Sequence, residues 1–317
     1  MKNNNRSSKT LGICFVTVAL FLSISLNAQS VFDHEGITYR VIQDADEAST
    51  FGTVAVTAKS GGFYEGSVVI PNAVKQSDET YADTYKVIAI DAEAFKGCPN
   101  LVEVRFPMSL EFIGFAAFSE CPKLSKVEIP DGNLYDLGLS AFASSGLESI
   151  SIPRRVTEIP AFTFNECRQL KQVLLSDNIT KIGESAFTYC QSLCLIELPT
   201  NLREIGNGAF MACGLKNITL PDQIVSIPEN AFGLCFNLEE AFFSPNTKNI
   251  GSCAFVFCCH LSKIHCPETA SINEDAFYGC IAIPNQYQSP NVYFGIDTKE
   301  KMESYIKGLI PQIWNMK

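Results

Sequence analysis

Residues and motifs that carry most enzyme chemistry are scarce in this sequence. It has three histidines in 317 residues, and a lone histidine such as His34, in the expected β-rich N-terminal cap, is usually structural. The G-x-S-x-G, P-loop and H-E-x-x-H motifs are absent, and no spacing marks two carboxylates as an acid and base pair. We therefore expect no catalytic residue, cofactor or metal and no enzyme activity. A hydrolase is the least favoured alternative.

Long hydrophobic runs are also lacking, with one exception near the start of the chain. Leu11–Leu26 carries no charge, follows Lys2, Arg6 and Lys9, and leads to the small residue Ala28. This order is typical of a secretory signal peptide, so we predict residues 1–28 to be removed. The run is short for a membrane span, although a retained anchor is the alternative. The sequence predicts an exported protein that is secreted, cell-surface or periplasmic, with no membrane span in the mature chain.

Basic residues are few relative to acidic ones. The chain has 24 Lys and Arg against 34 Asp and Glu, and loss of the three basic residues in the expected signal leaves 21 against 34, a net charge of −13. Such a chain repels phosphate backbones, so nucleic acid is not an expected partner. The acidity alone does not establish a cationic partner.

A repeat dominates the rest of the sequence. The pair Ala-Phe recurs every 22 to 24 residues, and Thr163-Phe164 fills the one remaining position. A constant period of this length is typical of a solenoid, and it predicts nine repeats. The repeated phenylalanines are Phe95, Phe118, Phe142, Phe164, Phe187, Phe210, Phe232, Phe255 and Phe277.

Each repeat has the same internal layout. An Ile or Leu lies five residues before the Phe and is usually followed by Gly, which we expect to permit a tight bend. A Cys lies three residues after the Phe, except at Ser145. A short alternating segment then ends in Pro, as in Val104-Arg105-Phe106-Pro107. Alternation predicts a strand with Val104 and Phe106 inward and Arg105 outward, and Pro ends it. One unit cannot bury this apolar set alone, so stability must come from stacking.

The pattern L-x-x-V-x-L-P-x-x-[VIL]-x-x-I-G-x-x-A-F-x-x-C resembles the BspA-like leucine-rich repeats over residues 87–283. The resemblance implies a leucine-rich-repeat solenoid of the α/β-type repeat class, with mostly short parallel strands and loops in a right-handed curved coil. Members occur in surface and secreted proteins of host-associated bacteria. The resemblance therefore implies adhesion or recognition of a protein or glycan ligand, whose identity it does not give.

Segments on both sides of the repeats are expected to cover the ends of the solenoid. We predict a β-rich N-terminal cap over residues 29–86, with strands at 38–42, 53–58 and 67–70. The nine repeats span 87–283. The C-terminal cap, 284–317, is predicted to contain a helix that starts near Asp297 and places Met302, Tyr305, Ile306 and Leu309 on one face. A partner-binding helix is the alternative.

Thirteen cysteines raise the question of disulfides or metal sites. The cysteines that recur in the repeats would point in parallel, which suits a disulfide poorly, so we expect free, buried thiols. Cys266 replaces an inward strand residue and should also be buried. Cys194, Cys253 and Cys259 are the expected accessible thiols. The cluster Cys258-Cys259-His260 with His265-Cys266 resembles a metal site, but the repeat phase points these side chains in different directions.

Two outward columns of side chains are predicted on the face of the strands. One column is Glu103, Lys126, Ser149, Gln172, Leu195, Asn217, Glu240 and Lys263, and the other is Arg105, Glu128, Ser151, Leu174, Glu197, Thr219, Phe242 and His265. We expect Leu174 and Leu195 to lie on neighbouring strands. The candidate partner-binding surface consists of Leu174, Leu195, Phe242, Arg105, Glu128, Glu197 and Lys263. The sequence thus favours a monomeric, non-enzymatic binding protein, with a structural or assembly component of the cell envelope as the alternative.

Overall fold

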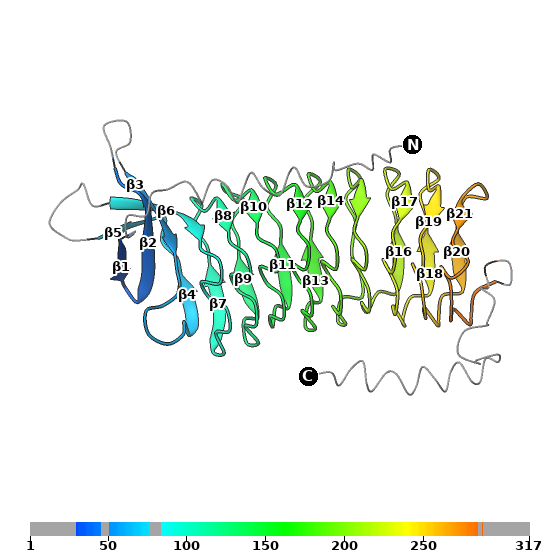
Figure 1. The fold of residues 1–317 in the computed structure, drawn as a ribbon, viewed down its shortest axis with the longest axis horizontal. Helices are drawn as coiled ribbons and strands as arrows, with labels where there is room; N and C mark the ends of the chain where they lie inside the picture. The colour runs from blue at the N-terminus through cyan, green and yellow to red at the C-terminus, as the bar shows by residue number, and fades with distance from the viewer. Residues whose placement is uncertain (1–29, 46–50, 77–83, 285–286, 288–317) are drawn as a thin grey trace, which may run out of the picture. The chain divides into compact units, whose positions relative to one another are not determined.

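The structure, a computed structural model, describes residues 30–45, 51–76, 84–284 and 287. The chain divides into two units, Met1–Ser30 and Val31–Lys317. The expected signal peptide in the first unit and the expected helix near Asp297 lie outside the described residues. All the strands discussed below belong to the second unit (Figure 1). Within the described part, no helix has the length and apolar character needed to cross a membrane.

The N-terminal part of the second unit is a small sheet that continues into the repeats. β1, β2 and β3 pair antiparallel, and β3 then pairs parallel with β6, which also carries the short antiparallel β5. Strands occur at all three predicted positions. The strands are β1 (Val31–His34), β2 (Ile37–Gln43), β3 (Gly52–Val56), β4 (Gly66–Val69), β5 (Ala73–Lys75) and β6 (Thr84–Ile90).

The repeats form a parallel β-solenoid in which each coil supplies one strand to each of two rows, except that the coil with residues 193–199 has no strand in the first row (Figure 1). The first row continues from β4 through β7 (Leu101–Arg105), β9 (Lys126–Glu128), β11 (Ser149–Ser151), β13 (Gln172–Leu174), β16 (Asn217–Thr219), β18 (Glu240–Phe242) and β20 (Lys263–His265). The second row continues from β6 through β8 (Phe112–Ile113), β10 (Asp136–Leu137), β12 (Glu158–Ile159), β14 (Lys181–Ile182), β15 (Glu204–Ile205), β17 (Ser226–Ile227), β19 (Asn249–Ile250) and β21 (Ser271–Ile272).

A column of phenylalanine rings runs through the core. Consecutive rings from Phe95 to Phe277 stack with centroids 4.7–5.7 Å apart and planes within 3–18° of each other. The eight steps between the nine rings correspond to about eight turns of chain. Every one of these rings is at most 2 % exposed. The predicted leucine-rich-repeat solenoid of short parallel strands is confirmed.

The coils return through turns rather than helices, so the α/β-type repeat expected from the resemblance is wrong within the described residues. Most of these turns place a residue with positive φ two positions before and two positions after the core phenylalanine, as Ser140 and Ser144 do around Phe142. Two left-handed residues reverse the chain within six residues, which leaves no room for a helix.

The glycine that follows the inward Ile or Leu has a different role from the predicted one. Gly138 and Gly206 have no positive φ, so they are not needed for the bend. A Cβ on either residue would lie 2.4 Å from main-chain atoms of the preceding coil, at Gly114 and Glu184 respectively. Glycine is required here because the backbones of adjacent coils approach too closely for a side chain.

Candidate partner-binding surface

The outward side chains of the first row of strands form one face of the repeats, which we call the strand face. Inward residues such as Val104 and Val127 are at most 7 % exposed, whereas the outward Leu174 and Arg105 are more than half exposed. The predicted strand phase is therefore confirmed. The opposite pattern would have placed the predicted binding residues in the core.

Four charged side chains on β7 and β9 form a closed network on this face. Lys126 Nζ lies 2.9 Å from a carboxylate oxygen of Glu103 and also pairs with Glu128. Arg105 Nε lies 3.2 Å from Glu103 and 3.3 Å from Glu128. The hydrogen bond from Lys126 lowers the pKa of Glu103. Two positive and two negative side chains pair with one another, so the network is neutral as a whole. It forms a polar wall along this part of the strand face.

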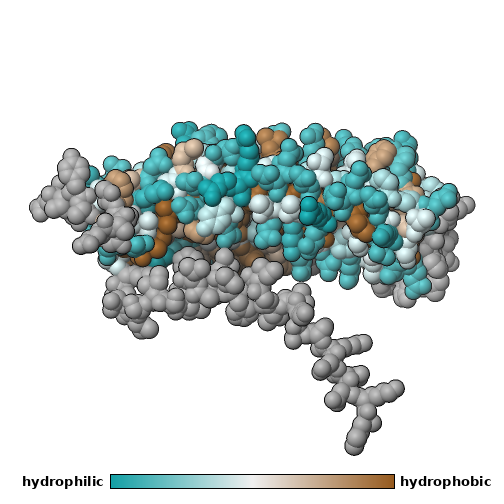
Figure 2. All heavy atoms as spheres, turned by 90° about the horizontal axis from the view of Figure 1, so that it is seen from above, coloured by the Kyte–Doolittle hydropathy of each residue, from teal (hydrophilic) through white to brown (hydrophobic). Residues whose placement is uncertain are grey.

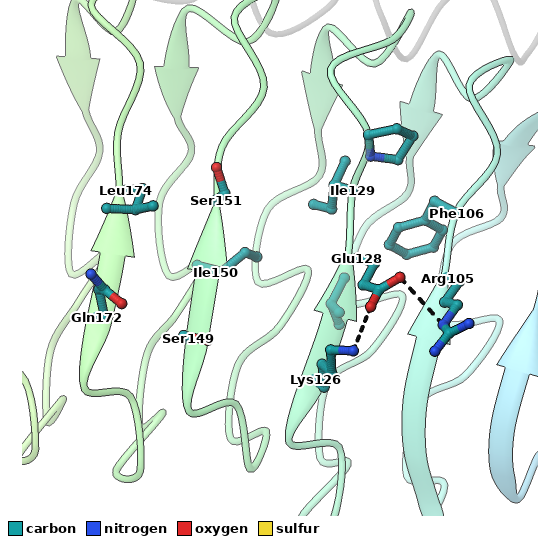
Figure 3. A pocket seen from close by; sticks show the side chains of 12 residues that line it. Arg105, Phe106, Lys126, Glu128, Ile129, Ser149, Ile150, Ser151, Gln172 and Leu174 are labelled. Carbon is teal, nitrogen blue, oxygen red and sulfur yellow. Dashed lines mark hydrogen bonds and ion pairs between the residues drawn. The ribbon is translucent and has the colours of Figure 1, made fainter.

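A groove of about 450 Å³ lies beside this wall, over β11. Ser149 and Ser151 on β11 are short, so its floor is low. Longer side chains rise on both flanks, Lys126 and Glu128 from β9 and Leu174 from β13 (Figure 3). Phe106, Val127, Ile129 and Ile150 contribute apolar surface below, and Gln172 completes the lining.

The groove continues past the end of the strands. A second hollow of about 700 Å³ shares Ile129, Ser151 and Leu174 with the first and extends it over the loops that follow β9, β11 and β13. Its lining includes Asp131, Ile152, Pro153, Arg154, Leu175, Ser176, Asp177 and Asn178. The two hollows therefore adjoin one another, and we call them together the β11 groove.

The ladder of hydrogen bonds opens beside this groove. Three residue pairs are in register between β7 and β9 and three between β11 and β13, but only Ser149 and Lys126 are paired between β11 and β9. The flanking coils differ in length, since Phe118 and Phe142 are 24 residues apart and Phe142 and Phe164 only 22. This is the largest difference between neighbouring coils, but length alone does not decide where the ladder opens, because the same row is also interrupted at residues 193–199 between two coils of 23 residues.

The prediction that Leu174 and Leu195 lie on neighbouring strands is wrong. Residues 193–199 form no strand, and the first row is interrupted there between β13 and β16. Leu195 is 56 % exposed, and Glu197 and Cys194 are exposed in the same segment. These residues lie on the strand face but outside the β11 groove.

Phe242 and Lys263 form a separate cluster near the other end of the face. The Phe242 ring stacks on the His265 ring with centroids 4.1 Å apart. His265 Nε2 lies 2.9 Å from Glu240, whose carboxylate is also 3.8 Å from Lys263 Nζ. Of the predicted binding residues, Arg105, Glu128 and Leu174 line the β11 groove, and Leu195, Glu197, Phe242 and Lys263 are not part of its lining.

The sequence prediction overlooked the two serines that make the floor of the groove. Ser149 and Ser151 were treated as ordinary outward residues. Their coil is the only one of the eight that places serine in both outward columns. Short residues in both columns of one coil, next to a coil of unusual length, are a signal that the sequence does contain.

The cysteines that recur in the repeats are buried and form no disulfide within the described residues, as predicted. Each thiol from Cys121 onward donates to a main-chain carbonyl oxygen of an earlier coil, such as Cys167 Sγ to Phe142 at 3.1 Å. Cys194 is exposed and Cys253 half-buried, but Cys259 is buried beside Tyr278, so its predicted accessibility is wrong. Cys266 is only half-buried and packs against the core.

The five side chains that resembled a metal site do not meet. Cys258 Sγ bonds to the Phe232 carbonyl in the core, while His260 is exposed and contacts the carbonyl oxygen of Phe236. His265 lies on the strand face. Across the described part of the chain, no three His, Cys, Asp or Glu residues are placed to share a metal ion.

Comparisons with known proteins agree with this architecture. A family model described as BspA type Leucine rich repeat region matches residues 83–193 and 157–284, in six copies. The Pneumococcal vaccine antigen PcpA is similar in structure, with a TM-score of 0.57 and 18 % identity over 80 % of this chain and 75 % of that one. A leucine rich cell surface protein from Faecalibacterium prausnitzii has a TM-score of 0.48 and 21 % identity over 82 % and 88 % of the two chains. The likeness to PcpA shows the fold. No curated protein matches the chain.

Proposed function

The chain belongs to the BspA-type leucine-rich repeat family, and we propose that it is an exported, non-enzymatic protein that binds a protein or glycan partner with its strand face. The observation that carries the proposal is the β11 groove. It combines exposed apolar surface at Leu174 with fixed charges at Arg105 and Glu128. Concave surfaces with apolar contact area and a few fixed polar groups are typical of binding sites. Export is supported by the predicted signal peptide.

The face of the coils that Figure 2 shows gives a comparison for the strand face. The coil edge that is uppermost in Figure 1 is mainly hydrophilic, with hydrophobic side chains in separate small patches (Figure 2). Small scattered apolar residues are normal on a protein surface. The β11 groove differs because its apolar residues line a hollow beside the charged network of β7 and β9.

A triple variant tests the proposal. Leu174→Ser, Leu195→Ser and Phe242→Ser together should reduce binding to the partner and leave the fold intact, because exposed substitutions usually change stability by under about 0.5 kcal/mol each. The matched control changes three residues of similar exposure that lie off the strand face, Phe115, Leu139 and Val225. Both variants are measured against immobilised matrix proteins, a glycan array and the producing cell's own envelope.

The ligand panel also separates the two candidate roles. Binding to matrix proteins or glycans supports recognition of an external partner, whereas binding to the cell's own envelope alone supports an assembly role. If both triple variants lose binding equally, or neither does, the strand face is not the binding surface.

A further inference from the structure

We propose that the β11 groove binds an extended polypeptide segment that carries an apolar residue followed or preceded by a basic one. This inference rests on the proposed binding function of the strand face and specifies the ligand class. Four features of the groove support it: its dimensions, its unpaired main-chain groups, its charge and its lack of exposed aromatic rings.

The groove has the dimensions of a single extended chain. Its flanks, β9 and β13, are two strand spacings apart, so the space between their side chains is roughly 5 to 10 Å wide. The groove follows the chain from Ser149 to Arg154, which spans roughly 17 Å in extended form. A peptide of about six residues fits this space.

Main-chain groups without partners line the opened ladder. Phe106, Ile129 and Ile152 occupy the same position in three successive coils. The Phe106 N–H donates to the Glu128 carbonyl of the next coil at 3.0 Å, and the Ile152 N–H donates to the Leu174 carbonyl at 2.9 Å. Among the described residues, Ile129 N–H has no such acceptor. A peptide carbonyl above β11 can accept this hydrogen bond, and a peptide N–H can donate to the Ser151 carbonyl opposite. Extended peptides use main-chain hydrogen bonds of this kind when they bind.

A second polar group lacks a partner farther along the groove. The hydroxyl oxygen of Ser176 is the one buried side-chain nitrogen or oxygen of the described residues without a hydrogen-bond partner. Unpaired buried polar groups are costly. Ser176 lies in the lining near Asp177, but the hydroxyl oxygen itself is buried, so a ligand in the groove would not reach it.

The charge of the groove is uneven. At the Arg105 end, the four-residue network is neutral. At the other end, Arg154 lies 2.9 Å from Asp131, and Asp177 has no cation within ion-pair distance in the described part. This end therefore carries one excess negative charge, which favours a Lys or Arg side chain of the ligand. Ile129 and Leu174, between the two ends, provide the contact for an apolar side chain.

The groove is poorly suited to a glycan. Sugar rings bind proteins largely through stacking on exposed aromatic faces, but the only aromatic lining residue is Phe106, which is 6 % exposed. The exposed aromatic pair of the strand face, Phe242 and His265, lies on β18 and β20, away from the groove. A polypeptide is therefore the better fit.

The test uses a library of acetylated hexapeptides. Each peptide contains one Leu and one Lys, the other positions are Ser or Thr, and the library covers every pair of positions for the Leu and the Lys. The protein is the full chain after residue 28, and the controls are the same peptides with Leu→Ser or Lys→Glu, together with maltohexaose and chitohexaose. We expect a subset of the Leu/Lys peptides to bind at least about tenfold more tightly than their controls. Binding should also slow hydrogen exchange at the Ile129 amide.

Two substitutions with matched controls locate the binding. Ser151→Tyr fills the floor of the groove and should weaken peptide binding at least about tenfold, whereas Thr219→Tyr, at the same coil position on β16, should not. Asp177→Lys should weaken binding of the Lys peptides, and Asp222→Lys, its equivalent in another coil, should not. Because these two residues act independently, one variant suffices if the other does not fold.

Three results would overturn the groove proposal: no Leu/Lys peptide binds, only the oligosaccharides bind, or each variant and its control weaken binding equally. If the peptides fail while the Leu174, Leu195 and Phe242 triple variant still loses its macromolecular partner, the strand face remains the binding surface and only the ligand class is wrong.

Discussion

Gly138 lies against Gly114 of the preceding coil so closely that a Cβ on Gly138 would be 2.4 Å from the Gly114 carbonyl carbon and oxygen. Gly138→Ala should therefore push two coils apart and lower the free energy of unfolding by about 1–3 kcal/mol. Gly61→Ala is the control, because Gly61 has no positive φ and its Cβ would meet no atom within 4 Å. Urea unfolding of both variants measures the difference. Equal stabilities would show that the coils can separate at no cost.

Thiol accessibility should divide the cysteines into two groups. In the native protein we expect rapid labelling of Cys194 and slower labelling of Cys253, because only these two and Cys266 are not buried among the described cysteines. After denaturation without reductant, the buried cysteines of the repeats should label as free thiols. Mass spectrometry of the labelled peptides measures both. Disulfides between adjacent coils in the denatured sample would contradict the structure.

Stability should fall in alkaline solution because of the buried thiols. Burial raises the pKa of Cys167 to about 11, above the ordinary thiol value of about 8.5. The folded state therefore holds this proton more tightly, and its contribution is complete below about pH 8.5 and is lost as the pH rises toward 11. Each pH unit in this window should cost up to about 1.4 kcal/mol from this thiol.

Urea unfolding between pH 8 and pH 10.5 tests this slope, with Cys167→Ala as the comparison. The variant should be less stable at pH 8 and should lose less stability as the pH rises. Parallel slopes for the two proteins would mean that Cys167 keeps an ordinary pKa in the folded chain.

The sequence predicted the features that repeat and missed those that depend on differences between coils. Alternation around Val104 identified the inward and outward sides of the first-row strands, and the spacing of Phe95 to Phe277 identified the stack, but the second row of short strands was not predicted. The role of Gly138 could not be assigned correctly, since the atoms that exclude its Cβ belong to another coil. Cys259 was misplaced because it is buried beside Tyr278, a residue of the following coil, and the pattern of one repeat does not specify that contact.

The β11 groove was only partly predictable for the same reason. Arg105, Glu128 and Leu174 were selected as outward residues, and all three line the groove. The opening of the ladder beside Ser151 depends on how adjacent coils fit together. The spacing of the phenylalanines does not predict it, because the same row is also interrupted between coils of equal length, so the position at which the ladder opens requires the three-dimensional register.

Hydrogen exchange should reveal this opening in the free protein. The amides of Phe106, Ile129 and Ile152 occupy the same position in three successive coils, but only Phe106 and Ile152 donate to a main-chain carbonyl. Exchange requires a free or transiently opened N–H, so Ile129 should exchange markedly faster than the other two. The comparison is internally controlled, because the three amides have the same position within the repeat and are measured in one sample at one pH and temperature. Equal protection of all three would mean that the ladder between β9 and β11 is closed in solution, and the groove would then lose the main-chain groups through which we propose that it holds a peptide.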